Sequence, residues 1–233
     1  TFHIGGQEQF YLESQAAIAY PGEEGQMVVH SSTQNPTEIQ TVVAEMLGVG
    51  FHEVVCVTKR MGGGFGGKET QAAIPAMMAA LVARKTGRAA RVIFDKDTDM
   101  RSTGKRHPYL VRWEVGFERD GRIHALKYEF FSNGGCSLDL SPSIMERTLL
   151  HAENAYYIPH AHFRGRICFT NLPSNTAFRG FGGPQGMFAI ESVVEAVARS
   201  LGIPTDLVRK RNFYGSGGER DTTPYGMTVE DNI

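Results

Sequence analysis

The chain lacks the features that would place it at once in a functional class. Its 233 residues contain three scattered cysteines, which argues against a disulfide framework and against a Cys-rich zinc or iron–sulfur site. No apolar run approaches the roughly 20 residues needed to span a bilayer, and no signal-peptide pattern is present. The formal charge of −1 gives no electrostatic reason to expect a nucleic-acid or membrane partner. We therefore expect a cytoplasmic protein without either partner.

Hydrolytic and metalloprotease motifs are also missing. The eight histidines show no H-E-x-x-H or other metal-ligand spacing, and no G-x-S-x-G nucleophile elbow occurs. The sequence begins at Thr1 without a methionine and stops at Ile233 in what looks like an unfinished element. From this we expect a piece of a longer protein.

Glycine, in contrast, is abundant and clustered. The motif Gly-Phe-Gly-Gly occurs twice, in the first glycine loop (residues 62–67) and the second glycine loop (residues 180–183), each followed by a segment with helical apolar spacing. Each ordered glycine costs roughly 0.5–1 kcal/mol relative to alanine, so something must approach these backbones closely. Unpaired amide N–H groups at a helix start suit a phosphate, a dithiolene or an oxo group. The alternative is that both loops are tight turns that fill space under a sheet.

The first glycine loop nearly matches a nucleotide-binding P-loop. Gly62 and the pair Gly67-Lys68 have the correct spacing, but Glu69 stands where a P-loop needs Ser or Thr to ligate magnesium. Its carboxylate would repel a nucleotide phosphate, which disfavours a nucleotide hydrolase.

Helices and strands are expected to alternate along the chain. Asn35 caps, Pro36 opens and Gly48 ends an amphipathic helix. Further helices are expected at 70–86, 143–150, 185–201 and 204–211, and strands at 54–58, 91–94, 109–117, 123–131 and 163–169. The strands 109–117 and 123–131 form a hairpin across the turn Asp120-Gly121. The prediction is an α+β fold with mixed sheets and packed helices, in which two lobes share the order strand, glycine loop, helix, as after an old duplication.

Apolar spacing also predicts which helical residues face the core. For the helix 70–86 these are Ile74, Met77, Met78, Leu81 and Val82. For the helix 185–201 they are Met187, Ile190, Val194, Val197 and Leu201.

Four residues could carry chemistry. Glu69 follows the first glycine loop, and Arg147 lies in an apolar-flanked stretch where an unpaired charge would be costly. They either pair with another group or point into a pocket, and the alternative is that both lie at the surface in separate salt bridges. Phe181 is either core packing or a stacking platform. Gln7 lies in a polar run that an interior would not ordinarily contain.

Taken together, several motifs resemble the molybdenum-cofactor domain of the xanthine dehydrogenase family of molybdenum hydroxylases. They are spread in order over nearly the whole chain: residues 5–13, residues 60–69, Arg106-His107-Pro108, Ile144-Met145-Glu146-Arg147 and residues 170–186. The resemblance implies that residues 1–233 are part of a molybdopterin-binding domain, truncated on its C-terminal side.

The resemblance also implies a role for each matching position. Gln7 would hydrogen-bond the oxygen ligand of molybdenum, Phe65 would bring its backbone to the metal's ligand sphere, and Arg179 would make a main-chain contact. These three would therefore lie near the metal, reaching it through its ligands or by backbone contacts. Gly64, Gly66 and Gly180 complete the cofactor-binding set.

Three further positions resemble the family's substrate pocket. Glu69 and Arg147 match a polar pair that orients a purine and serves catalysis, and Phe181 matches an aromatic that stacks on its ring. Related aldehyde oxidases generally lack both charges, so the resemblance favours hypoxanthine or xanthine, converted toward urate with water-derived oxygen. A buried guanidinium would stabilise the negative charge that develops on the ring.

Other parts of the family's enzyme are expected outside this chain. The general-base glutamate would lie beyond Ile233, so the isolated chain is expected to be inactive, and 2Fe–2S and FAD centres would lie in other domains or subunits of a homodimeric parent. Two alternatives stay open: a molybdenum hydroxylase of aldehydes or other N-heterocycles, and a structural or assembly fragment without cofactor.

Overall fold

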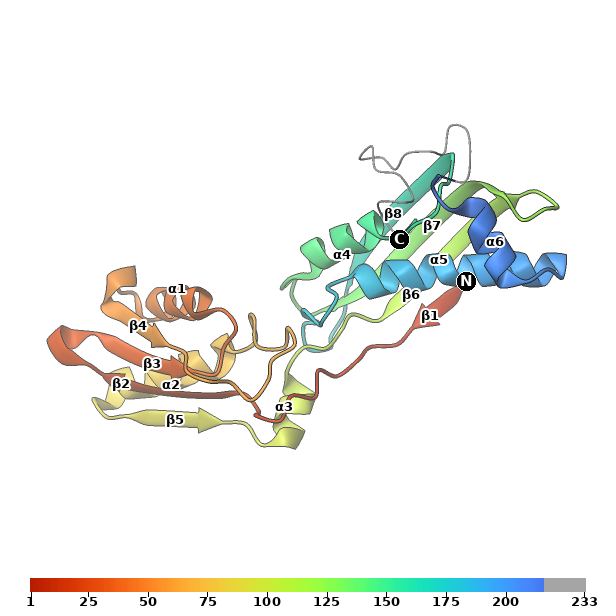
Figure 1. Ribbon diagram of the computed structural model, residues 1–233. Helices are drawn as coiled ribbons and strands as arrows, with labels where there is room; N and C mark the ends of the chain where they lie inside the picture. The colour runs from red at the N-terminus through yellow and green to blue at the C-terminus, as the bar shows by residue number, and fades with distance from the viewer. Residues whose placement is uncertain (216–233) are drawn as a thin grey trace.

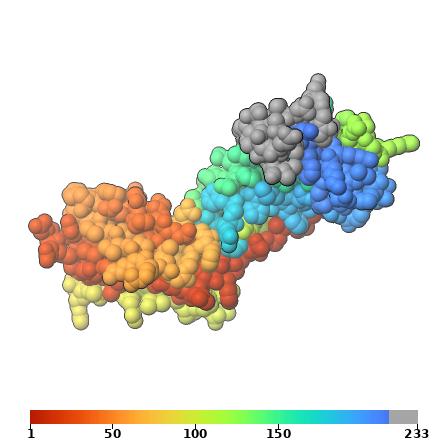
Figure 2. All heavy atoms as spheres, in the orientation of Figure 1, coloured from red at the N-terminus to blue at the C-terminus, as the bar shows by residue number. Residues whose placement is uncertain are grey.

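The computed structural model describes residues 1–215, and these form two lobes arranged end to end (Figures 1 and 2). The chain starts in the second lobe with β1, builds the first lobe from β2 to β5, and returns through α3 to complete the second lobe (Figure 1). Both sheets mix parallel and antiparallel pairs. The α+β prediction with mixed sheets is therefore confirmed.

The first lobe is a four-stranded sheet with two helices on one face. Its strand order is β4-β3-β2-β5, with only β3 and β4 parallel. The elements are β2 (Ala16–Pro21), β3 (Met27–Ser31), α1 (Pro36–Leu47), β4 (Val54–Val57), α2 (Ala73–Thr86) and β5 (Ala90–Ile93), with 3-10 turns η1 (Glu23–Gly25) and η2 (Phe51–Glu53).

The helix α1 matches its prediction residue by residue. The Oδ1 atom of Asn35 accepts a hydrogen bond from the amide of Glu38 at 3.2 Å, Pro36 opens the helix, and Gly48 ends it in the left-handed conformation with φ of 66°. Capping, a fixed φ and a glycine stop thus define a helix without any tertiary information.

The predicted inner face of α2 is wrong for three of its five residues, while Ile74 and Met77 are partly buried and Met77 packs against the core. Ala76, Ala79, Ala80 and Ala83 are fully buried, whereas Met78, Leu81 and Val82 are exposed. Alanine side chains let the helix approach β2 closely, so the sheet selects the small face and leaves the larger apolar side chains outside. The helix also begins at Ala73 rather than at Thr70.

The second lobe is built on the predicted hairpin. The sheet order is β1-β6-β7-β8, in which β7 and β8 are parallel. Its elements are β1 (Phe2–Ile4), β6 (Tyr109–Phe117), β7 (Ile123–Gly135), α4 (Ser141–Leu150), β8 (His160–Phe169), α5 (Gly183–Leu201) and α6 (Thr205–Asn212), and α3 (Lys96–Ser102) links the lobes.

The helix α5 packs its predicted face on this sheet with one exception. Ile190, Val194 and Val197 are buried and Leu201 is partly buried, but Met187 is exposed. Each lobe thus has the predicted order: β4, first glycine loop and α2 in one, and β8, second glycine loop and α5 in the other.

Candidate functional site

The two glycine loops meet at the junction of the lobes. The amide N–H of Arg179 donates to the carbonyl oxygen of Phe65 at 3.0 Å, so the loops are joined by main-chain atoms. A Cβ atom added at Gly66 would lie 2.8 Å from the carbonyl carbon and oxygen of Ala177, so only glycine permits this approach. Segments 116 residues apart therefore form one surface, as predicted.

The loops also share one turn conformation. Phe65 and Gly66 have φ of 52° and 98°, and Phe181 and Gly182 have φ of 48° and 92°. In each Gly-Phe-Gly-Gly turn the amide of the last glycine donates a hydrogen bond to the carbonyl oxygen of the first. The distance is 2.8 Å from Gly67 to Gly64 and 3.0 Å from Gly183 to Gly180. A phenylalanine in the left-handed region costs roughly 1–3 kcal/mol, and such strain concentrates at functional sites.

The loops differ in how they lead into a helix. The second loop passes directly into α5, which begins at Gly183. The first loop does not open onto α2, because a bent segment precedes the helix start at Ala73. The expectation of an anion cradle at a helix N-terminus is therefore wrong for the first loop, and only the second can use a helix dipole.

Gln34 supports the first loop and is absent from the residues that the sequence predicts. Its Oε1 atom accepts hydrogen bonds from the amides of Gly66 at 2.8 Å and Lys68 at 3.3 Å. A Cβ at Gly64 would lie only 2.5 Å from this oxygen. No local signal marks Gln34, since its partners lie more than 30 positions downstream.

Lys68 points into the first lobe, away from any phosphate position. Its side chain is fully buried, and Nζ donates to Ser32 Oγ at 2.8 Å and lies 3.4 Å from Glu13 Oε2. Burial lowers the pKa of the Lys68 ammonium, and the carboxylate of Glu13 opposes that shift. The lysine therefore anchors the loop to the sheet, which removes the remaining support for a P-loop.

Gln7 is exposed, and Arg106 connects it to the second glycine loop. The Nε atom of Arg106 donates to Gln7 Oε1 at 2.6 Å, and its Nη2 donates to the carbonyl oxygen of Arg179 at 2.7 Å. The guanidinium also stacks on Phe178 at 4.2 Å. Because the side-chain oxygen of Gln7 already accepts from Arg106, the side-chain N–H₂ group of Gln7 is left as a donor. The sequence motif contains Arg106, but its role was missed.

The predicted substrate residues lie around this junction. Glu69 is half-buried, and burial, followed by the negative charge of Asp139, raises the pKa of its carboxyl above the ordinary value. Arg147 is exposed on α4, not confined in an apolar interior. Phe181 is half-buried, and within residues 1–215 no hydrogen bond or ion pair joins Glu69 to Arg147.

The helix α4 places Arg147 beside the second glycine loop. Thr148 Oγ1 donates to the carbonyl oxygen of Gly182 at 3.1 Å, and a Cβ at Gly182 would lie 2.2 Å from the carbonyl oxygen of Ile144. The turn that carries Phe181 therefore rests on the turn of α4 that carries Arg147.

The donors at the junction suit an anionic or oxo-bearing cofactor. Within residues 1–215 the amide N–H groups of Gly64 and Phe65 have no hydrogen-bond acceptor, although Gly64 is buried. The residue Phe65 itself is 49% exposed. The same part of the chain holds no group of three or more His, Cys, Asp or Glu side chains able to hold a metal ion. The residues present fit a metal carried by an organic ligand that accepts hydrogen bonds.

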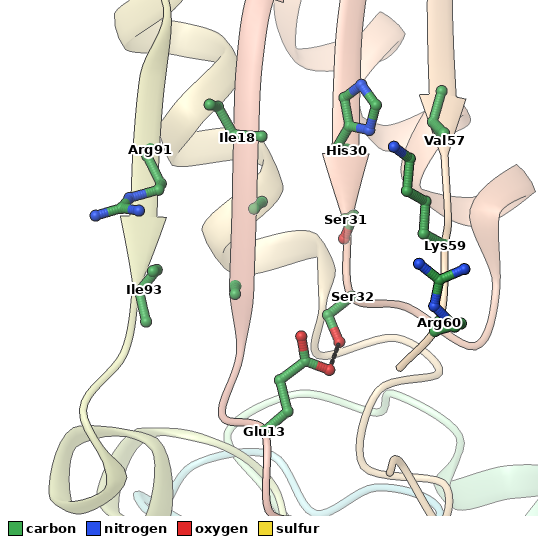
Figure 3. Close-up of a pocket in the computed structure, with 12 residues that line it drawn as sticks. Glu13, Ile18, His30, Ser31, Ser32, Val57, Lys59, Arg60, Arg91 and Ile93 are labelled. Carbon is green, nitrogen blue, oxygen red and sulfur yellow. Dashed lines mark hydrogen bonds between the residues drawn. The ribbon is translucent and has the colours of Figure 1, made fainter. Parts of the chain in front are cut away.

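A separate hollow of about 210 Å³ lies on the open face of the first-lobe sheet (Figure 3). Lys59, Arg60, Arg91 and His30 line it together with the carboxylate of Glu13, which accepts from Ser32 Oγ at 2.8 Å. It contains none of the predicted site residues.

Across the described residues, none of the helices combines the length and apolar character required to cross a bilayer.

Comparison with known proteins gives consistent matches over this chain. The family described as molybdopterin cofactor-binding domain matches residues 1–213. Xanthine dehydrogenase/oxidase of Felis catus is 52% identical over 98% of the chain, and nicotinate hydroxylase of Emericella nidulans is 45% identical over 99%. The chain spans 17% of the length of each.

Solved structures agree on the architecture. The aldehyde oxidoreductase of Desulfovibrio gigas superposes with a TM-score of 0.81 and 30% identity, covering 97% of this chain and 24% of that one. The architecture of mixed sheets with packed helices is thus shared with that oxidoreductase.

Proposed function

Because this chain belongs to the molybdopterin cofactor-binding domain family, we propose that residues 1–233 form part of that domain in a purine-hydroxylating enzyme of the xanthine dehydrogenase type. The parent protein would also supply the rest of the domain, a 2Fe–2S centre and FAD, and would act as a cytoplasmic homodimer. The observation that carries the proposal is the main-chain contact between the loops, from Arg179 N–H to the Phe65 carbonyl at 3.0 Å.

The loop junction would hold the cofactor by main-chain groups. The free amides of Gly64 and Phe65 would donate to it from the first loop, and Arg179 and Gly180 would approach it from the second. Gln7 offers its amide N–H₂ group, whose orientation Arg106 fixes. Molybdenum-molybdopterin, when bound, supplies the two-electron oxidation, while the protein supplies orientation and electrostatics.

Glu69, Arg147 and Phe181 would select the substrate. A carboxyl with a raised pKa keeps its proton to higher pH, so Glu69 can donate a hydrogen bond to a purine over a wider pH range. The guanidinium of Arg147 would face a ring carbonyl and stabilise the negative charge that hydroxylation pushes onto the ring. Phe181 would stack on the ring face.

The test measures kcat/KM of the parent enzyme carrying Glu69→Ala or Arg147→Ala, with xanthine and with a small aldehyde. We expect each variant to lose at least about tenfold on xanthine, or about 1.4 kcal/mol, and little on the aldehyde. Glu146→Ala, an exposed neighbour on α4, is the matched control and should change neither. Equal losses on both substrates, or none, would contradict purine selection.

A second candidate substrate is another N-heterocycle or an aldehyde. The relative named nicotinate hydroxylase is 45% identical to this chain, so nicotinate belongs in the same substrate panel. A wild-type parent that turns over nicotinate or aldehydes but not purines would favour this candidate. A parent that purifies without molybdenum or pterin would instead favour a structural or assembly role.

A further inference from the structure

Asp139 lies where the two lobes touch, in the segment between β7 and α4, and each of its carboxylate oxygens serves one lobe. Oδ2 accepts from Thr70 Oγ1 at 2.8 Å and from Gln71 Nε2 at 2.9 Å, both in the first lobe. Oδ1 accepts from Thr176 Oγ1 at 2.6 Å and from the amide of Leu140 at 2.7 Å, both in the second. One side chain therefore ties the lobes together.

The four donors are all neutral, so they leave the charge of Asp139 in place. Within residues 1–215 no lysine or arginine forms an ion pair with this carboxylate. His107 is close enough to be influenced by it, but burial lowers the pKa of the His107 imidazole to about 4. The imidazole is therefore neutral at pH 7 and adds no positive charge beside Asp139.

The backbone of Asp139 is held in an unfavourable conformation. Its φ of 44° lies in the left-handed region, which costs a residue other than glycine roughly 1 kcal/mol or more. Asp is among the residues that tolerate this region, and the four hydrogen bonds offset the cost. The strain brings the carboxylate to the lobe contact.

One partner of Asp139 adjoins Glu69, and another precedes the helix that carries Arg147. Glu69 immediately precedes Thr70, and the pKa of its carboxyl responds to Asp139. Arg147 lies on α4, whose first residue, Ser141, is two positions beyond Asp139. Ser141 Oγ in turn contacts His107 Nε2 at 2.7 Å, which fixes the start of that helix.

We propose that Asp139 is a positioning residue that sets the separation of Glu69 and Arg147 across the lobe contact and so determines the preference for a purine over a small aldehyde. This inference rests on the proposed function. In this role Asp139 does not contact the substrate. Its Oδ2 atom holds the segment after Glu69, and its Oδ1 atom holds the start of the helix that carries Arg147.

The experiment uses the parent enzyme with Asp139→Asn, which keeps the shape but has one acceptor oxygen in place of two. We expect kcat/KM for xanthine to fall at least tenfold and kcat/KM for a small aldehyde to change less than about threefold, with molybdenum and pterin content unchanged. The pH limb of xanthine turnover that reports Glu69 should move to lower pH, because the neighbouring negative charge is gone. A merely structural residue would lower the turnover of both substrates alike and leave their ratio unchanged.

Two further variants keep the test decisive. Asp206→Asn removes an exposed carboxylate of α6 and should leave both substrates and the pH profile unchanged. Thr70→Val removes a single donor to Oδ2 and should lower xanthine turnover about threefold while sparing the aldehyde. If Asp139→Asn does not accumulate as folded enzyme, the substrate ratio of Thr70→Val decides.

The outcomes separate this inference from the proposed function. Wild-type levels of xanthine turnover and an unmoved pH limb in Asp139→Asn, or equal losses on both substrates, overturn the role of Asp139 alone. The same holds for an unchanged ratio in Thr70→Val. A wild-type parent that contains molybdenum but does not hydroxylate purines overturns both proposals.

Discussion

The two glycine loops have the same turn but are held by different means. Side chains from distant segments support the first loop, with Gln34 bonded to its amides and Lys68 anchored in the sheet of the first lobe. The helix α4 supports the second: Gly182 packs against the backbone carbonyl of Ile144, and the side chain of Thr148 one turn later donates to the Gly182 carbonyl. The repeated motif thus encodes a shared surface, while the support of each copy is specific to its lobe.

The largest expected effect is at the backbone-supported loop. In Gly182→Ala the new Cβ would lie 2.2 Å from the carbonyl oxygen of Ile144, with φ at 92°, so strain and overpacking add. We expect the free energy of unfolding of the parent protein to fall by at least about 3 kcal/mol, measured by chemical denaturation.

Gly25→Ala is the matched control for that variant. Gly25 has a similar φ of 82°, but no atom lies within 4 Å of its added Cβ. It should cost only the conformational strain, about 1 kcal/mol. Equal costs at the two glycines would show that the packing of Gly182 on α4 does not matter.

Next in size is the pH dependence of stability that comes from His107, which is buried against Ser141 at the start of α4. Its pKa is about 4 when folded against an ordinary 6.5, so the unfolded chain binds the proton more readily. The contribution of the neutral His107 to the free energy of unfolding is therefore fully present above pH 6.5 and is lost as the pH falls toward 4. The loss between pH 7 and pH 5 is about 2 kcal/mol. Thermal unfolding of the wild type and of His107→Asn between pH 5 and pH 7 measures how the stability of each depends on pH. If both lose stability equally as the pH falls, the prediction is refuted.

A comparable effect is expected at the side-chain-supported loop. Gln34→Leu leaves the amides of Gly66 and Lys68 without their acceptor, which costs roughly 1–3 kcal/mol. Gln34→Glu keeps an acceptor oxygen and should recover most of that loss. Thermal unfolding and molybdenum content of the two variants measure it, and identical behaviour would show that Gln34 does not support the loop.

The same contrast separates what the sequence could predict from what it could not. Local signals located α1, from Asn35 to Gly48, and the hairpin around Asp120-Gly121, because caps and turns depend on neighbouring residues. Apolar spacing failed for α2, where close packing on the sheet favours alanines over Met78 and Leu81. It also gave no prediction of β2 and β3, the two central strands of the first lobe.

The site was predictable only in part for the same reason. The Gly-Phe-Gly-Gly repeat indicated both turns and their meeting, which the contact of Phe65 with Arg179 confirms. Gln34, Arg106 and Asp139 act through partners more than 30 residues away, so no local pattern reveals them. The roles given to Gln7, Glu69 and the other site residues stay predictions.

Anomalous diffraction at the molybdenum absorption edge, from crystals of the intact parent protein, tests the central claim most directly. The account predicts a single molybdenum peak adjoining both Phe65-Gly66 of the first glycine loop and Arg179-Gly180 of the second. A peak beside only one loop, a peak elsewhere such as the open sheet face of the first lobe, or no peak in active enzyme would contradict it.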